Sequence, residues 1–250
     1  MGVYAGPANA WSNFTDENRI DASTKVVVQD GLVLNLDAGA STSYPGSGTS
    51  WSDLSGNSNT GTLTNGPTYS SDDGGSIVFD SVNDYASVSS SASIPYGASA
   101  RTISIWFYTN STSWANNVNT LFFYGAGSIG QAFGIDMDFY PKMEVFTWGG
   151  AGRDITFDTT YSQVGWKNIC VTYNGSTTIL IYENGVFTQT STLSDTCNTL
   201  SSNVYIGAIN PSDNHPYYDG NIAQVSIYNR ALTASEVSQN FNALRSRFGI

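Results

Sequence analysis

The sequence predicts an all-β protein, a sandwich or barrel of short strands that ends in a single helix. The chain has 250 residues, which fits one large β domain. More than about ten short runs with a two-residue apolar period are separated by turn residues at intervals of roughly 8–12 positions. A capped helical pattern occurs only near the C-terminus.

Two-residue alternation marks the clearest strands. Residues 32–36 place Leu at every second position, and residues 102–107 alternate Ile and Phe with Thr, Ser and Trp. Asn184 and Gly185 separate two such runs, which predicts a hairpin with a type I′ turn. The runs 76–80 and 84–89 are separated by three residues, and we predict a second hairpin there.

A long polar segment, Ser41 to Gly75, contains mostly turn residues. A loop of that length without structure of its own is uncommon in a compact domain. Its large apolar side chains are spaced like pegs, so we expect them to hold the segment against a sheet; they are Tyr44, Trp51, Leu54, Leu63 and Tyr69.

The helix is predicted at about residues 234–244. Thr233 and Glu236 form a T-x-x-E capping box, in which each side chain satisfies a backbone N–H at the helix start. Val237, Phe241 and Leu244 then form one apolar stripe. An isolated helix of this length is marginal in water, so the stripe must dock on the sandwich.

Residues 1–28 differ from the remainder in having little periodicity, and we interpret them as an arm or linker before a domain at 29–250. A disordered terminus is the alternative. The aromatic residues Tyr4, Trp11 and Phe14 favour an arm that docks on another surface. The start of the chain lacks the basic and apolar regions of a secretory signal.

Charge and composition exclude some classes of function. The net charge of −11, with 9 Lys and Arg in all, argues against a nucleic-acid partner. No apolar run approaches the ~18 residues of a membrane span, so no membrane partner is expected. Cys170 and Cys197 are too few for a disulfide framework, and either a single bridge or two free thiols fits the sequence.

Four segments occur in an order that resembles one superfamily. They are residues 74–89 ("GGSIVFDSVNDYASVS"), 101–114, 165–190 and 203–241, the last ending in the capped helix. Together they resemble the laminin-G-like branch of the concanavalin A-like lectin/glucanase superfamily over about residues 29–245. The resemblance implies an antiparallel two-sheet jelly-roll sandwich. The superfamily includes lectins, adhesins, glycosidases and structural proteins, so the fold does not determine the function.

A narrower resemblance concerns "DGLVLNLDAG", "SYPGSG", "WSDLSGNSNTGTLTNGPTY" and the ending "NFNALRSRFGI". These segments are similar to jelly-roll domains in structural proteins of tailed phages, especially cyanophage-like ones. The resemblance implies a non-enzymatic protein at the virion surface, as a capsid decoration or a fibre component. Its virion partners would be bound through Tyr4, Trp11 and Phe14, and a homo-oligomer, guessed as a trimer, is expected. A bacterial lectin or adhesin is the alternative.

A glycoside hydrolase is the second alternative, and the sequence argues against it. Glucanases of this superfamily carry a Glu-x-Asp-x-Glu strand motif, and the closest stretch here has Asp136 and Asp138 without either glutamate. Glu144 lies beyond a Tyr-Pro pair and is expected on another strand. His215 is the only histidine, and it follows Asn214 in a turn-like loop, which does not suit a catalyst.

Calcium is the candidate cation, although none is required for folding. The predicted ligands are Asp53 and Asn57 in the long polar segment, with Asp80 and Asp84 near the second hairpin. Turn chemistry, in which Asp and Asn side chains bond to nearby backbone N–H groups, is the favoured explanation of Asp53, Asn57 and Asn59. The hairpin turn is the simplest explanation of Asp80 and Asp84.

A polysaccharide ligand would need aromatic side chains in loops, flanked by amides and carboxylates. Three segments qualify, and each has packing on the sheet as its alternative. The predicted contacts are Trp114 with Asn116, then Trp148, and finally Asn214, His215, Tyr217, Tyr218 and Asp219.

Overall fold

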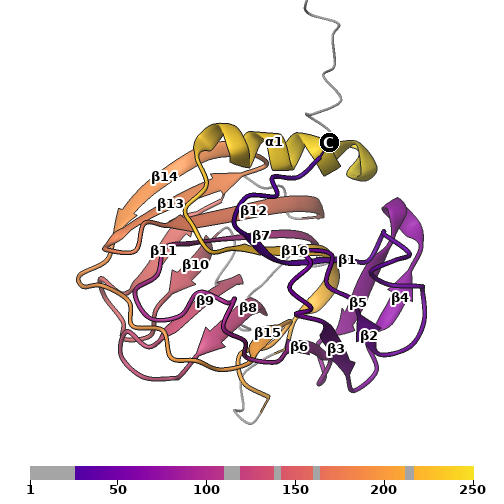
Figure 1. Ribbon diagram of the computed structural model, residues 1–250, viewed down its shortest axis with the longest axis horizontal. Helices are drawn as coiled ribbons and strands as arrows, with labels where there is room; N and C mark the ends of the chain where they lie inside the picture. The colour runs from indigo at the N-terminus through magenta and orange to yellow at the C-terminus, as the bar shows by residue number, and fades with distance from the viewer. Residues whose placement is uncertain (1–25, 110–118, 138–141, 160–163, 212–216) are drawn as a thin grey trace, which may run out of the picture.

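The computed structural model describes residues 26–109, 119–137, 142–159, 164–211 and 217–250, which form two packed antiparallel sheets (Figure 1). The predicted all-β sandwich with one short C-terminal helix is confirmed. The predictions for Tyr4, Trp11 and Phe14 concern residues 1–25, which lie outside the described residues.

The first sheet, sheet A, lies beneath the helix in Figure 1. In spatial order it contains β14 (Val186–Thr192), β13 (Thr178–Glu183), β12 (Gly165–Tyr173), β7 (Arg101–Thr109), β16 (Asp219–Tyr228), β5 (Ser76–Asp80) and β4 (Thr68–Ser70), and β1 (Leu32–Asp37) also pairs with β16. The turn between β13 and β14 has φ of 48° at Asn184 and 73° at Gly185. Positive φ at both central positions is the signature of the predicted type I′ hairpin.

The second sheet, sheet B, faces away from the helix (Figure 1). Its spatial order is β11 (Asp154–Asp158), β10 (Lys142–Phe146), β9 (Ala132–Met137), β8 (Asn119–Gly125), β15 (Val204–Ile206), β6 (Tyr85–Val88), β3 (Gly61–Thr64) and β2 (Ser50–Trp51). Alternate residues of both sheets meet in one buried core, for example Ile105 and Phe107 of β7 with Phe133 and Ile135 of β9. The other face of each sheet is therefore left for helix, loops or solvent.

The long polar segment is more ordered than its composition indicated, since it contributes β2, β3 and β4. The expected pegs Tyr44, Trp51 and Leu63 are buried, and Tyr69 packs against the core. Leu54 is 37% exposed, so its predicted role as a peg is wrong.

The predicted hairpin at residues 76–89 is also wrong. β5 belongs to sheet A and β6 to sheet B, so the chain passes from one sheet to the other between them. Two short apolar runs near each other in sequence can pair or can lie in opposite sheets, and periodicity alone does not distinguish these outcomes. Asp84 lies where the chain passes between the two sheets, and it is 3% exposed there.

Helix α1 (Ala234–Leu244) covers the outer face of sheet A and continues into the 3₁₀ turn η4 (Arg245–Phe248) (Figure 1). The predicted capping box is present: Thr233 accepts from the Glu236 N–H, and the Glu236 side chain accepts from Thr233 N–H. Val237 packs with Tyr228 and Leu232, and Phe241 stacks on Trp106 at a centroid distance of 5.4 Å.

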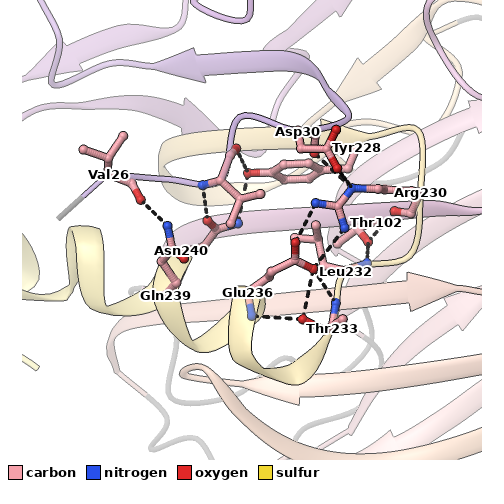
Figure 2. A network of polar contacts seen from close by, with 11 residues as sticks. Val26, Asp30, Thr102, Tyr228, Arg230, Leu232, Thr233, Glu236, Gln239 and Asn240 are labelled. Atoms are coloured by element: carbon pink, nitrogen blue, oxygen red, sulfur yellow. Dashed lines mark hydrogen bonds and ion pairs between the residues drawn. The ribbon is translucent and has the colours of Figure 1, made fainter. Parts of the chain in front are cut away.

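The N-terminal end of the described chain runs along this helix, held by polar contacts (Figure 2). The Gln239 amide donates to the Val26 carbonyl at 2.9 Å, and the Val28 N–H donates to Asn240 Oδ1 at 2.8 Å. The Tyr228 hydroxyl donates to the Val28 carbonyl at 3.0 Å. Residues 26–28 thus join the domain through contacts with α1 and with the Tyr228 side chain of β16.

Cys170 and Cys197 are both buried free thiols, which decides between the two alternatives that the sequence left open. Burial raises the pKa of the Cys170 thiol, as it does that of Cys197, so neither favours the reactive thiolate. Among the residues described, no helix is long and apolar enough to cross a membrane.

Candidate functional site

The outer face of sheet B contains a groove of about 450 Å³. Strands β9 and β10 form its base, and the loops after β8, β10 and β15 form its walls. Its lining includes the side chains of Ile129, Asp136, Glu144, Phe146, Trp148 and Ile209. The groove therefore combines apolar and aromatic walls with three carboxylates, those of Asp136, Glu144 and Asp154. A mixture of apolar surface and a few polar groups is typical of small-ligand sites.

The carboxylates of Asp136 and Glu144 belong to cross-strand neighbours. Asp136 of β9 is directly opposite Glu144 of β10 in the antiparallel register, so both side chains are on the outer face. Residues paired in this way have Cβ atoms about 4.5–5.5 Å apart. Asp136 is 4% exposed, and Glu144 accepts a hydrogen bond from the Thr156 hydroxyl at 3.3 Å. The expectation that Glu144 belongs to another strand is confirmed, whereas Asp138 lies outside the described residues.

Two aromatic side chains, Phe146 and Trp148, line the groove, and the buried Phe123 packs against Phe146. Phe123 and Phe146 are nearly parallel with centroids 5.9 Å apart, and Trp148 lies 6.2 Å from Phe146. Gly134 lies beneath Phe146, where any Cβ would overlap the phenyl ring. The glycine therefore permits the ring to lie flat on the sheet, which makes a rigid aromatic surface.

Trp148 adopts a backbone conformation that is rare for a bulky residue, with φ of 68°. The Asp154 carboxylate holds this turn, because it accepts from the Trp148 N–H at 3.0 Å and from the Gly150 N–H at 2.5 Å. The Trp148 carbonyl accepts from Gly130 N–H at 2.8 Å. Backbone strain maintained by specific bonds is found mainly at functional sites, so Trp148 is the strongest single indication of one here.

Of the remaining predicted saccharide contacts, the three that the structure describes do not line this groove. Tyr218 is fully buried, and its hydroxyl donates to the Tyr108 carbonyl at 2.8 Å. The prediction that Tyr218 contacts a saccharide is therefore wrong, because its ring packs against Phe79 in the core and does not reach a surface ligand. Tyr217 is partly exposed and Asp219 exposed, but neither lines the groove among the described residues. Trp114, Asn116, Asn214 and His215 lie outside the described residues.

The calcium ligands predicted in the long polar segment are engaged by the protein itself. The Asp53 carboxylate accepts from the backbone N–H groups of Asn35, Ser55 and Asn59 and from the Ser55 hydroxyl. Asn57 donates through its amide to the Leu32 carbonyl. A cation at Asp53 would have to displace these donors, so the geometry favours the turn interpretation at this position.

Asp80 and Asp84 have different surroundings. Burial raises the pKa of the Asp84 carboxyl, and the neighbouring Asp80 carboxyl raises it further. Asp84 Oδ1 is buried without a hydrogen-bond partner among the described residues. Such a pair fits either a shared proton or a cation. No three His, Cys, Asp or Glu side chains of the described chain gather around one point, so the calcium prediction remains a prediction.

The sequence profile of the concanavalin A-like lectin/glucanases superfamily matches residues 80–238, more than half of the chain. The chain belongs to this superfamily. No curated protein shows significant sequence similarity to it. The groove of this superfamily member spans β9 and β10, both within the matched residues.

Solved structures show the same fold at low identity. The binding domain of Paraclostridial Mosquitocidal Protein 1 is 19% identical with a TM-score of 0.64, and covers 86% of this chain and 52% of its own. The binding domain of Botulinum Neurotoxin DC in complex with SialylT is 14% identical with a TM-score of 0.65, covering 86% and 52%. This superfamily member thus spans about half the length of these toxin domains.

A third structure is similar over its whole length. Domain 4 of AbnA, a GH43 extracellular arabinanase from Geobacillus stearothermophilus, was solved in complex with arabinotriose. It is 18% identical to this chain with a TM-score of 0.61, and the match covers 84% of this chain and 97% of that domain. The comparison supports the fold assignment at single-domain scale.

The sequence indicated Trp148 as a candidate ligand contact but did not indicate most of the residues that line the groove with it. Phe146, Ile129 and Ile209 come from three separate loops or strands, and only the sheet register brings them together. Glu144 carried a signal, because it alternates with the core residues Met143 and Val145 and must face outward.

Proposed function

We propose that this chain is a non-enzymatic domain that binds saccharides through the sheet B groove and is displayed at a virion surface. The observation that carries the binding proposal is the strained Trp148 turn, which Asp154 holds beside the Phe146 ring. A sugar ring has an apolar C–H face and a rim of hydroxyl groups. Trp148 and Phe146 suit the face, and Asp136 and Glu144 accept hydrogen bonds from the rim.

The placement of the N-terminal segment supports display. Residues 26–28 run along α1 on the outer face of sheet A, whereas the groove is on the outer face of sheet B (Figure 1). An attachment through the preceding residues would leave the groove pointing away from the particle. Many displayed copies would amplify a weak affinity through multivalency. The virion location rests on the sequence resemblance to phage structural proteins, and the trimer is a guess from the closed symmetry that is common in displayed oligomers.

The binding proposal predicts that Trp148→Ala lowers saccharide affinity at least tenfold, because the variant removes the exposed aromatic surface. Phe187→Ala is the matched control, since Phe187 is 49% exposed on edge strand β14 and makes no groove contact among the described residues. A glycan array followed by calorimetry on the best ligand measures both variants. Equal affinity of Trp148→Ala and the unchanged protein would show that saccharides do not bind at this groove.

Hydrolysis is the second candidate function, because Asp136 and Glu144 are opposite each other in the groove. Retaining glycosidases hold two carboxyl groups about 5–5.5 Å apart. The non-enzymatic proposal predicts no release of reducing ends from the polysaccharides that bind. Release that disappears in Glu144→Gln while binding persists would establish the hydrolase instead.

A further inference from the structure

A second pocket, of about 250 Å³, lies on the outer face of sheet A beyond the end of α1. Its lining includes the side chains of Asp72, Asp73, Ser76, Tyr108, Trp166 and Asn221. This volume is below the roughly 300–1,000 Å³ of sites for larger ligands, so it accommodates one small ring. None of these residues was predicted from the sequence as part of a site.

Sheet register brings the central side chains together. Tyr108 of β7 is opposite Trp166 of β12 on one side and opposite Asn221 of β16 on the other. All three therefore stand on the outer face, in a row across three neighbouring strands. The Tyr108 and Trp166 rings meet edge to face with centroids 5.5 Å apart, and the Asn221 amide donates to the Ser76 hydroxyl at 3.0 Å.

The C-terminal turn holds the pocket in shape. Asp73, in the 3₁₀ turn η3 (Asp72–Gly74), has φ of 49°. Its carboxylate accepts from Trp166 Nε1 at 2.8 Å, and its carbonyl accepts from Arg247 Nε at 3.2 Å. Phe248 packs on Trp166 with centroids 4.5 Å apart. The indole is thus fixed in orientation before any ligand arrives, which lowers the entropic cost of binding.

We propose that this pocket is a second saccharide site, one that takes a single neutral sugar residue. Tyr108 and Trp166 supply aromatic surface, and Asp72, Asp73 and Asn221 supply hydrogen-bond acceptors and an amide donor for hydroxyl groups. Within the described residues the lining contains two carboxylates and no basic side chain, so an anionic sugar is repelled. The site is independent of the groove under Trp148.

The consequence is a domain with sugar sites on two opposite faces. The groove belongs to the outer face of sheet B and this pocket to the outer face of sheet A. A single copy then bridges two saccharide chains, or binds one chain beside its attachment surface and another facing outward. Two weak sites on one body raise the overall avidity when both are engaged.

The test is ¹⁹F NMR of the full chain labelled with 5-fluorotryptophan. Trp148→Phe and Trp166→Phe assign the two reporter signals, and the other signals show that each variant is folded. The probes are neutral trisaccharides (arabinotriose, cellotriose and maltotriose), with sialyllactose as the anionic comparison. We expect at least one neutral probe to shift the Trp166 signal with saturation, and sialyllactose to leave it in place.

Asp72→Ala supplies the second measurement, because the Asp72 side chain is exposed and its loss spares the Asp73–Trp166 contact. This variant should weaken the Trp166 titration at least fivefold and leave the Trp148 titration unchanged. Asp158→Ala, at an exposed position on edge strand β11, is the matched control.

The outcomes separate the two sites. A shift of the Trp166 signal that persists in Trp148→Phe supports the second site even when the groove binds nothing. Saturating probe that moves only the Trp148 signal overturns the second site and leaves the groove proposal intact. If no probe moves the Trp166 signal, or if Asp72→Ala titrates like the unchanged protein, the second site is refuted.

Discussion

The carboxyl group of Asp84 shows how strongly the environment of one residue depends on the path of the chain. It is buried where the chain crosses between the sheets, beside the Asp80 carboxyl. Burial and this neighbour raise the pKa of the Asp84 carboxyl, so its ionised form is costly in the folded protein. An unfolded chain has no such cost, which makes the residue a source of pH dependence.

We therefore predict that Asp84→Asn stabilises the protein at pH 7 by about 1 kcal/mol in the presence of a chelator. Because the folded pKa lies above the unfolded one, the native protein loses stability as the pH rises through the unfolded pKa toward the folded one. The variant should lack that loss. Thermal and urea unfolding between about pH 3 and about pH 8, a range that begins below the ordinary Asp pKa of about 3.9, measure it.

Calcium distinguishes the two interpretations of the Asp80–Asp84 pair. A calcium-dependent rise in melting temperature that Asp84→Asn abolishes would support the predicted cation site. A variant that is less stable than the native protein in chelator would contradict the pKa argument.

At the scale of elements, α1 shows the closest agreement between sequence and structure. Its cap, its bounds and its apolar stripe follow from local rules, because a helix satisfies its own backbone and repeats every 3.6 residues. Its polar side is extended by tertiary contacts: Glu236 accepts from Arg230 Nη2 at 2.6 Å, and Arg230 also pairs with Asp30 at 2.9 Å (Figure 2). The cap therefore also ties down the segment that enters the domain.

The Arg230–Glu236 contact predicts that the stability of the protein falls at acid pH. The hydrogen bond from Arg230 lowers the pKa of Glu236 to about 2, so its contribution to stability is present above about pH 4.5 and is lost as the pH falls toward 2. Glu236→Gln should cost about 1–2 kcal/mol at neutral pH, after allowance for solvent screening, and should flatten the acid limb of the stability curve.

The matched control is Thr233→Ala, which removes the cap but keeps the Arg230–Glu236 pair. It should cost about 1 kcal/mol and keep most of the acid limb, because Arg230, the main cause of the lowered Glu236 pKa, is retained while only the weaker Thr233 hydroxyl contact is lost. Both variants should bind saccharides at the Trp148 groove as the native protein does, since α1 is on the outer face of sheet A and the groove is on that of sheet B. If Glu236→Gln kept the native acid limb, the carboxylate would not be its cause.

At the scale of the whole molecule, the two outer faces of the sandwich carry different elements. Sheet A carries α1, the N-terminal segment and the C-terminal turn, while the outer face of sheet B carries the groove. This division is what the proposed display requires. It also keeps the two candidate sugar sites apart.

Attachment through the N-terminal residues is tested by truncation. Because Val28 is buried against α1, deletion of residues 1–25 should leave the domain folded and its melting temperature within a few degrees of the native value. Incorporation into particles should be lost. Quantitative mass spectrometry of purified particles measures occupancy, and full occupancy of the truncated protein would show that attachment occurs elsewhere.

The sequence by itself determined the features that depend on neighbours along the chain. The two-residue period, the turn at Asn184 and Gly185 and the cap at Thr233 are local, and they sufficed for the fold class, the helix and one hairpin. Only the tertiary structure decided which sheet β5 and β6 enter, and therefore which side chains share a face. Trp148, Glu144 and Phe146 gather in one groove, and Tyr108, Trp166 and Asn221 in another pocket, because register across strands sets these neighbours. Such contacts join residues far apart in the chain, and no local pattern encodes them.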